Sequence, residues 1–210
     1  APAGSSTRVT FCVFSLNHKD DQEHPVDLVP GTRYTARIPL NYIAHAFLPG
    51  HRLRVAISTN YWPMMMPAPE EATLTLFTDG CHLELPVRPT GADQPPFTIS
   101  SPEKAPHAPG HVTREGSAKR EARIDIATGE ITLVNHKDAG GYFFSDIGVV
   151  SDCRAIETYR IRPGDPLSYR CEISYEQLLS GRDWQARTVS VTALQAHAKH
   201  FHIDARIDAF

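Results

Sequence analysis

Short apolar runs bounded by tight-turn signals constrain the fold of this chain more than any other feature. Between Arg52 and Ser58, Leu53, Val55 and Ile57 alternate with arginine and serine, the pattern of a strand with one buried face. Pro-Gly and Asp-Gly pairs recur between such runs. They mark tight turns, because glycine takes the positive φ that such a turn requires. The sequence has no long amphipathic helical pattern. It therefore predicts an all-β protein, a β-sandwich or jelly roll, and disfavours a βαβ enzyme scaffold.

The expected strands fall on either side of a proline-rich segment. We expect strands over residues 8–16, 34–40, 52–58, 72–77 and 82–87, and then over 122–126, 131–133, 156–161, 167–173, 184–193 and 201–209. Hairpin turns are expected at Asp79-Gly80, Thr128-Gly129 and 162–165. A capping box of Ser174 with Gln177, before Gly181, predicts a short helix over 174–180. Residues 86–117 predict a surface strap or a disordered connection within a single domain of residues 1–210.

Net charge and the length of apolar runs limit the kinds of partner that this chain is expected to bind. The formal net charge of −3 predicts no nucleic-acid partner, because a binder would usually carry a basic face or stripe. No apolar run approaches the ~20 residues that span a bilayer, so we predict no membrane partner. Four cysteines, at positions 12, 81, 153 and 171, lack CxxC spacing. Their spacing leaves pairing open, and their low density favours reduced thiols and a cytoplasmic setting.

Residues 61–69 carry an unusual apolar load held between prolines. The segment reads Tyr61, Trp62, Pro63, Met64, Met65, Met66, Pro67, Ala68, Pro69. Proline cannot donate to a strand ladder, so we expect an irregular loop. Such a loop is either buried against a neighbour or serves as a contact surface.

Histidines provide the strongest metal-like pattern. His200 and His202 would lie on one side of a strand, followed on that side by Asp204. The glutamate and the downstream histidine of a complete cupin-like set are missing, so the alternative is a solvent-facing side of a strand. The serine motif of α/β-hydrolases, the P-loop, the Rossmann glycines and HExxH are also absent. We predict no catalytic set, no cofactor and no metal in this chain.

A family resemblance rests on specific blocks of sequence. They are Pro30-Gly31, Gly50-His51-Arg52-Leu53-Arg54, Tyr61-Trp62-Pro63 and Pro67-x-Pro69, with weaker matches at 15–19, 183–184 and 201–203. These blocks resemble the C-terminal domain of the CocE/NonD hydrolases, which include X-Pro dipeptidyl-peptidases, cocaine esterase and α-amino acid ester hydrolases.

The resemblance implies both fold and context. In that family an α/β-hydrolase domain carries the Ser-Asp-His triad, and a jelly-roll domain similar to galactose-binding domains packs beside the active site. No triad position maps onto this chain. We therefore expect a non-catalytic fragment of a larger serine hydrolase, with the α/β-hydrolase domain as its partner. It would shape the substrate pocket and support assembly. The expected contact residues are Tyr61, Trp62, Met64, Met65 and Met66.

The resemblance also has two departures. Met64–Met66 stand where relatives more often carry leucine and tryptophan. The chain is expected to begin after the first strands of the family domain and to stop before its last strand. A missing strand would leave an unpaired sheet edge, which makes a homo-oligomer a further expectation.

Two alternatives remain at this level. A stand-alone carbohydrate- or ligand-binding jelly roll would present Trp62, Tyr142 and Phe143 as exposed, coplanar rings. A metal-dependent, cupin-like enzyme would use His200 and His202.

Overall fold

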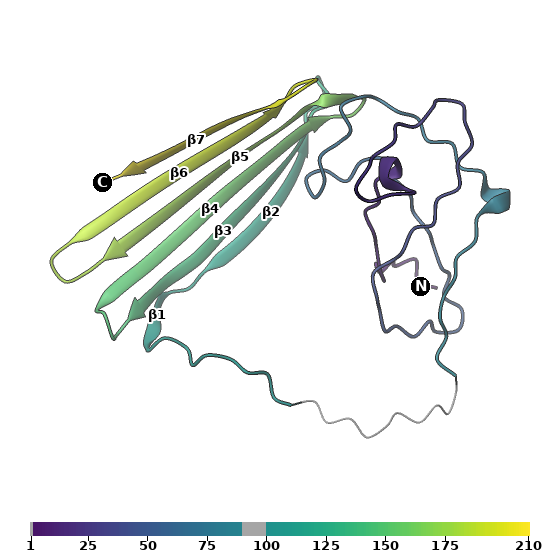
Figure 1. Cartoon of the computed structure of the whole chain (residues 1–210). Helices are drawn as coiled ribbons and strands as arrows, with labels where there is room; N and C mark the ends of the chain where they lie inside the picture. Colours follow the sequence, from purple (N-terminus) through teal and green to yellow (C-terminus); the bar gives the residue numbers. More distant parts are fainter. Residues whose placement is uncertain (1, 90–99) are drawn as a thin grey trace. The chain divides into compact units, whose positions relative to one another are not determined.

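The strands of this protein form one antiparallel sheet in the C-terminal half of the chain (Figure 1). The computed structural model describes residues 2–89 and 100–210, and within them it places seven strands. Contacts divide the chain into two units, Ala1–Ile57 and Ser58–Phe210, and the sheet belongs to the second. The all-β class is confirmed, whereas the jelly-roll topology and the single domain stay predictions.

The sheet is largely a meander of sequential hairpins. The strands are β1 (Gly110–Arg114), β2 (Ser117–Ile124), β3 (Ile131–Phe144), β4 (Val149–Arg162), β5 (Asp165–Ser180), β6 (Gln185–Ala196) and β7 (Phe201–Ala209). Their order is β1-β3-β4-β5-β6-β7, and β2 also pairs with β3. At the β2–β3 turn, Asp125 Oδ1 accepts hydrogen bonds from the backbone N–H groups of Ala127 and Thr128, and Gly129 takes φ +70°. The predicted hairpins at Thr128-Gly129 and 162–165 are therefore confirmed, as are the closing strands.

The two faces of the sheet differ in chemistry, because successive side chains of a strand point to opposite faces. One row, on what we call the apolar face, runs through Leu133, Tyr159, Cys171, Leu194 and Ile203. The neighbouring row, on what we call the polar face, runs through Thr132, Arg160, Arg170, Gln195 and His202. Among the described residues the buried hydrophobic side chains are Tyr169 and Ala196, which are 2% and 4% exposed.

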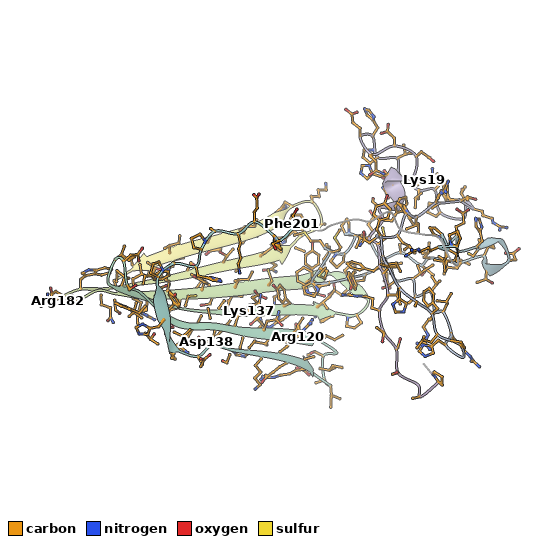
Figure 2. The ribbon with its side chains drawn as sticks, turned by 90° about the horizontal axis from the view of Figure 1, so that it is seen from below. Lys19, Arg120, Lys137, Asp138, Arg182 and Phe201 are labelled. Carbon is orange, nitrogen blue, oxygen red and sulfur yellow. The ribbon has the colours of Figure 1, made fainter. Side chains whose placement is uncertain are left out.

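An arginine clamp joins β1 to β3 and β4. The Arg114 guanidinium donates to both carboxylate oxygens of Asp138, at 2.8 and 2.7 Å, and to both of Asp152, at 2.8 and 2.7 Å. These hydrogen bonds lower the pKa of Asp138 (labelled in Figure 2) to about 2, and they lower the pKa of Asp152 as well. The register of β3 shifts beside the clamp, where Gly140 takes φ +79°. The clamp therefore holds a short strand onto an irregular stretch of its neighbour.

The predicted helix over 174–180 is wrong, because these residues lie inside β5. Tyr175 pairs with Ala155 of β4 on one side and with Ser190 of β6 on the other. Two neighbouring strands thus hydrogen-bond to the backbone N–H and C=O groups on both sides of β5. These bonds outweigh a local capping signal. The predicted strap over 86–117 is also too long, since β1 and the start of β2 lie within it. Its residues 90–99 lie outside the described residues.

The strands predicted before residue 90 are absent from the described part of the chain. Residues 8–15, 34–40, 52–58, 72–77 and 82–87 are irregular, and Leu16 begins a 3₁₀ turn. Thr78–Gly80 is also a 3₁₀ turn instead of a hairpin. Local bonds form instead: the Val26 N–H donates to the Asn17 carbonyl at 2.9 Å, and the Thr10 hydroxyl donates to the Asn41 carbonyl at 2.9 Å. Alternating apolar and polar residues indicate which side chains a strand could bury. They do not supply the neighbouring strand to which its backbone must hydrogen-bond.

Helical structure is limited to two short 3₁₀ turns in the described residues, Leu16–His18 and Thr78–Gly80. None of the helices placed there has the length and apolar character needed to cross a membrane.

Candidate functional site

The candidate site is the loop of residues 58–69, which we call the Trp-Met loop. Its polar residues shape its start: the Asn60 N–H donates to the Ser58 hydroxyl at 3.2 Å, and the Trp62 N–H donates to Asn60 Oδ1 at 2.8 Å. The Met65 N–H then donates to the Tyr61 carbonyl at 3.0 Å, closing one turn, and the Trp62–Pro63 peptide bond is cis. Short-range hydrogen bonds of this kind are a general property of serine and asparagine in turns. The loop is therefore a defined structure of its own.

Trp62 attaches this loop to the apolar face of the sheet. Its ring lies 4.8 Å from the Tyr169 ring, at an interplanar angle of 49°, and 5.8 Å from the Tyr159 ring, edge-on at 83°. These are favourable aromatic geometries. The indole Nε1 is buried and has no hydrogen-bond partner among residues 2–89 and 100–210. Burying that N–H group without a partner costs free energy. The ring contacts with Tyr159 and Tyr169 must therefore outweigh this cost to hold Trp62 in place.

The remaining apolar residues of the loop face outward. Met64, Met65 and Met66 are 64%, 45% and 50% exposed, and Tyr61 is 40% exposed. Methionine side chains are flexible and polarizable, so they adapt to an apolar partner. Of the five residues predicted to make contacts, four are thus on the open surface, and Trp62 lies against the sheet. Their contact with a catalytic domain stays a prediction.

The tyrosines beneath Trp62 are not acid–base groups near neutral pH. Burial raises the pKa of Tyr169, and burial together with the Glu157 carboxylate raises the pKa of Tyr159. The Tyr159 hydroxyl donates to Glu157 Oε2 at 3.2 Å. A hydrogen bond from Lys137 lowers the pKa of Glu157, so this acceptor stays ionised. Both phenols therefore remain protonated and serve packing.

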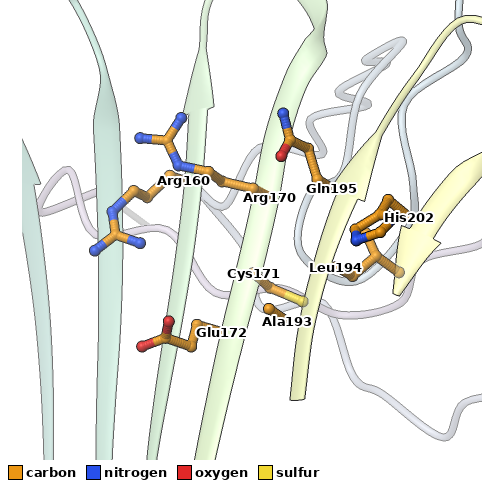
Figure 3. A pocket seen from close by; sticks show the side chains of 8 residues that line it. All are labelled: Arg160, Arg170, Cys171, Glu172, Ala193, Leu194, Gln195 and His202. Atoms are coloured by element: carbon orange, nitrogen blue, oxygen red, sulfur yellow. The ribbon is translucent and has the colours of Figure 1, made fainter. Parts of the chain in front are cut away.

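A shallow hollow of about 240 Å³ lies on the sheet across β4 to β7 (Figure 3). Its lining residues are Arg160, Arg170, Cys171, Glu172, Ala193, Leu194, Gln195 and His202. Arg170 donates to both oxygens of Glu130, at 2.8 and 3.1 Å, and the Nε of Arg160 is 3.9 Å from the same carboxylate. Burial raises the pKa of the Cys171 thiol, which disfavours the nucleophilic thiolate. The two arginines of the hollow thus lie against one carboxylate, and its thiol is held in the protonated form.

No motif in the sequence predicts this hollow. Arg160, Arg170, Gln195 and His202 become neighbours through cross-strand pairing, and no spacing along the chain signals that they meet.

The predicted pair of His200 and His202 on one strand is not formed. His200 lies in the turn before β7, where its ring stacks on His197 at 4.8 Å, and His202 lies within β7. Among residues 2–89 and 100–210 no three His, Cys, Asp or Glu side chains are grouped as metal ligands would be. Because His200 lies in the turn, it is not part of the strand, and its side chain does not share a strand face with His202.

The three rings of the carbohydrate-binding alternative do not form one platform. Tyr142 and Phe143 are consecutive in β3 and so point to opposite faces. Tyr142 lies beside Phe144 at 4.9 Å, Phe143 lies beside His111 at 5.3 Å, and Trp62 packs on Tyr169. Coplanar stacking on a sugar therefore has no support in this arrangement.

Comparison with known protein families gives a match to the first part of the chain. Residues 1–99 match the family model described as the X-Pro dipeptidyl-peptidase C-terminal non-catalytic domain. The matched range contains the whole Trp-Met loop and ends before β1. No curated protein and no solved structure was found to match the chain.

Proposed function

We propose that this chain, whose residues 1–99 match the model of the X-Pro dipeptidyl-peptidase C-terminal non-catalytic domain, is the accessory domain of a serine hydrolase. A non-catalytic C-terminal domain implies a catalytic domain in the parent protein. In this proposal that partner is an α/β-hydrolase domain, which acts on X-Pro peptides or esters by acyl transfer to its serine. The present chain binds beside the active site, shapes the wall of the substrate pocket and supports assembly.

The structure of the Trp-Met loop carries the proposal. Trp62 is packed against Tyr159 and Tyr169, while Met64, Met65 and Met66 are exposed next to it. An apolar surface held on a fixed anchor loses little conformational freedom when it binds, which favours association. The exposed methionines are therefore the proposed contact with the hydrolase domain, and Trp62 positions them.

The proposed fold is a jelly-roll sandwich in which the sheet is one layer. Ile203 and Ile207, on the apolar face of β7, are 61% and 75% exposed. An apolar sheet face is normally buried against another layer, which supports a sandwich. A cytoplasmic setting is also part of the proposal, and the four free thiols at 12, 81, 153 and 171 support it.

The accessory role is tested by assaying the purified chain alone. We expect no turnover of X-Pro-p-nitroanilides or of activated esters, because the chain contributes no triad. Turnover that co-purifies with the chain, and is lost on serine-directed inhibition, would overturn the accessory role.

The contact is tested in the complete parent hydrolase. The triple variant Met64→Ser, Met65→Ser, Met66→Ser should lower kcat/KM about tenfold or more, which corresponds to about 1.4 kcal/mol of lost interaction. The matched control is Ile124→Ser with Ile126→Ser, two exposed apolar residues outside the loop. Equal kcat/KM in the triple variant, the control variant and the unmodified enzyme would contradict the proposed contact.

A further inference from the structure

The hollow across β4 to β7 has an excess of positive charge on one side. Arg160 and Arg170 pair directly across β4 and β5, and both guanidinium groups lie against the single carboxylate of Glu130. Two arginines and one glutamate leave one positive charge uncompensated. Within the described residues, Arg170 uses only Nη2 to bond Glu130, and the Nε of Arg160, at 3.9 Å, is beyond hydrogen-bond distance. Both arginines therefore keep N–H donors for a further acceptor.

Another side of the hollow carries a negative charge. Glu172 follows Arg170 by two residues on β5, so both side chains lie on the polar face. In residues 2–89 and 100–210 the Glu172 carboxylate has no ion-pair or hydrogen-bond partner, and Figure 3 shows it apart from the two guanidinium groups. The arginines contact Glu130, next to the β2–β3 turn, and so leave Glu172 uncompensated. The hollow therefore has a positive side and a negative side.

Two further polar side chains and a small residue complete the lining. Gln195 and His202 continue the row of the arginines on β6 and β7, and neither has a partner within the described part of the chain. Ala193 lies opposite Glu172 on β6, and its methyl group leaves space between the larger side chains. A ligand seated over Ala193 would thus meet polar groups between the two charges.

We propose that this hollow binds a dipeptide whose two termini are free, with the carboxylate on Arg160 and Arg170 and the ammonium group on Glu172. Guanidinium groups recognise carboxylates through paired N–H donors. Arg170 and Glu172 are attached about 6.6 Å apart along β5, and two extended residues span about 7 Å. A free amino acid holds its two charges closer together, and a longer peptide separates them further.

The size of the hollow agrees with a ligand of this kind. Its volume is about 240 Å³, whereas sites for drug-sized ligands usually measure about 300–1,000 Å³. The peptide unit of the ligand would face Gln195 and His202, whose side chains can donate to its carbonyl oxygen. Because the hollow is shallow and its charges are exposed to water, we expect a dissociation constant of about 1 mM.

The source of the ligand rests on the proposed function, whereas its chemistry does not. An enzyme that removes X-Pro units releases dipeptides with free termini, so the hollow would bind the product of the parent hydrolase. Dipeptide binding by this chain needs no hydrolase domain. Absence of binding would therefore overturn the present inference and leave the accessory role untouched.

The inference is tested by NMR titration of the ¹⁵N-labelled 210-residue chain with the dipeptide Ala-Pro. We expect saturable shifts of the amides around Glu172 and Ala193. N-acetyl-Ala-Pro lacks the ammonium group and Ala-Pro-amide lacks the carboxylate, so each should bind about fivefold more weakly. Free alanine should also bind about fivefold more weakly, because it cannot reach both charges. These comparisons leave the protein unchanged, so they do not depend on the folding of a variant.

Two variants assign the charges to their partners. Glu172→Gln should weaken Ala-Pro binding about fivefold and leave N-acetyl-Ala-Pro binding unchanged. Arg160→Gln should weaken Ala-Pro binding by a similar factor and leave Ala-Pro-amide binding unchanged. The matched controls are Glu115→Gln and Arg182→Gln, which change exposed charges outside the hollow and should bind Ala-Pro normally. Circular dichroism checks that each variant keeps the sheet.

Three results would overturn the inference. The first is the absence of a saturable shift with Ala-Pro at ten times the expected dissociation constant. The second is binding of either blocked dipeptide, or of free alanine, as tight as that of Ala-Pro. The third is unchanged Ala-Pro affinity in both Glu172→Gln and Arg160→Gln.

Discussion

Tyr169 is the residue on which the packing of the second unit is centred. It is 2% exposed, and its ring contacts both Trp62 from the Trp-Met loop and Phe201 from β7. A single side chain thus connects an irregular loop, a central strand and an edge strand.

Removing that ring should destabilise the protein strongly. Tyr169→Ala should lower the free energy of unfolding by about 3–5 kcal/mol, because it removes transfer energy and leaves a cavity. Tyr169→Phe, which keeps the ring, should cost less than about 1.5 kcal/mol. Urea unfolding measures both. Tyr42→Ala is the control, since Tyr42 is fully exposed and its loss should stay within about 0.5 kcal/mol. A loss in Tyr169→Ala no larger than that control would contradict the packing role.

The Arg114 clamp makes stability depend on acid pH. The pKa of Asp138 falls on folding, from an ordinary value of 3.8 to about 2, because Arg114 donates two hydrogen bonds to it. A carboxylate with a depressed pKa contributes stability above its unfolded pKa, and this contribution is lost as pH falls through the folded value.

Stability should therefore fall between about pH 4 and pH 2 more steeply in the unmodified chain than in Asp138→Asn. Urea midpoints at pH 5, 4, 3 and 2 provide the comparison, and the variant should already be less stable at pH 5. Parallel pH profiles would show that Asp138 is not held by Arg114 in solution.

At the scale of elements, the irregular register of β3 depends on Gly140. Its φ is +79°, and a Cβ built there would lie 2.3 Å from the Arg114 carbonyl oxygen. Gly129, in the β2–β3 turn, has a similar φ of +70° and open space around it. The two glycines share their backbone conformation and differ in their surroundings.

Alanine at the two sites should separate conformational strain from steric clash. Gly129→Ala should cost about 1–2 kcal/mol, the ordinary penalty for a left-handed residue. Gly140→Ala should cost clearly more, because the β1 backbone must also move away. Thermal unfolding followed by circular dichroism compares the two variants. Equal losses would mean that β1 does not lie close to β3 at this point.

The contrast between β5 and the segments before residue 90 is also an element-scale effect. Residues 174–180 carry a helical capping signal and yet form strand, because β4 and β6 lie on both sides of them. Residues 52–58 carry a clear strand alternation and yet remain irregular in the structure. In both cases the presence or absence of a neighbouring strand decides the outcome, and the local pattern does not.

At the scale of the whole molecule, protection should follow position in the sheet. Amide hydrogen exchange of the complete chain should be slowest in β4 and β5, which have a strand on each side, and faster in β1 and β7. Exchange in β4 and β5 that is as fast as in β1 would contradict this order.

The family resemblance and the all-β class follow from the sequence, since both rest on local signals. Turn residues at Thr128-Gly129 and 162–165 specify two hairpins. The blocks around Gly50-His51-Arg52 and Tyr61-Trp62-Pro63 lie within residues 1–99, which match the family model. Such signals act over a few residues, so they can be recognised from the amino-acid sequence alone.

Tertiary structure decided the rest. It turned Trp62 onto Tyr169, left Met64–Met66 exposed, and made residues 174–180 a strand. Each of these depends on contacts between residues far apart in the chain. Burial and strand pairing are properties of neighbours in space, and the order of residues does not specify those neighbours by itself.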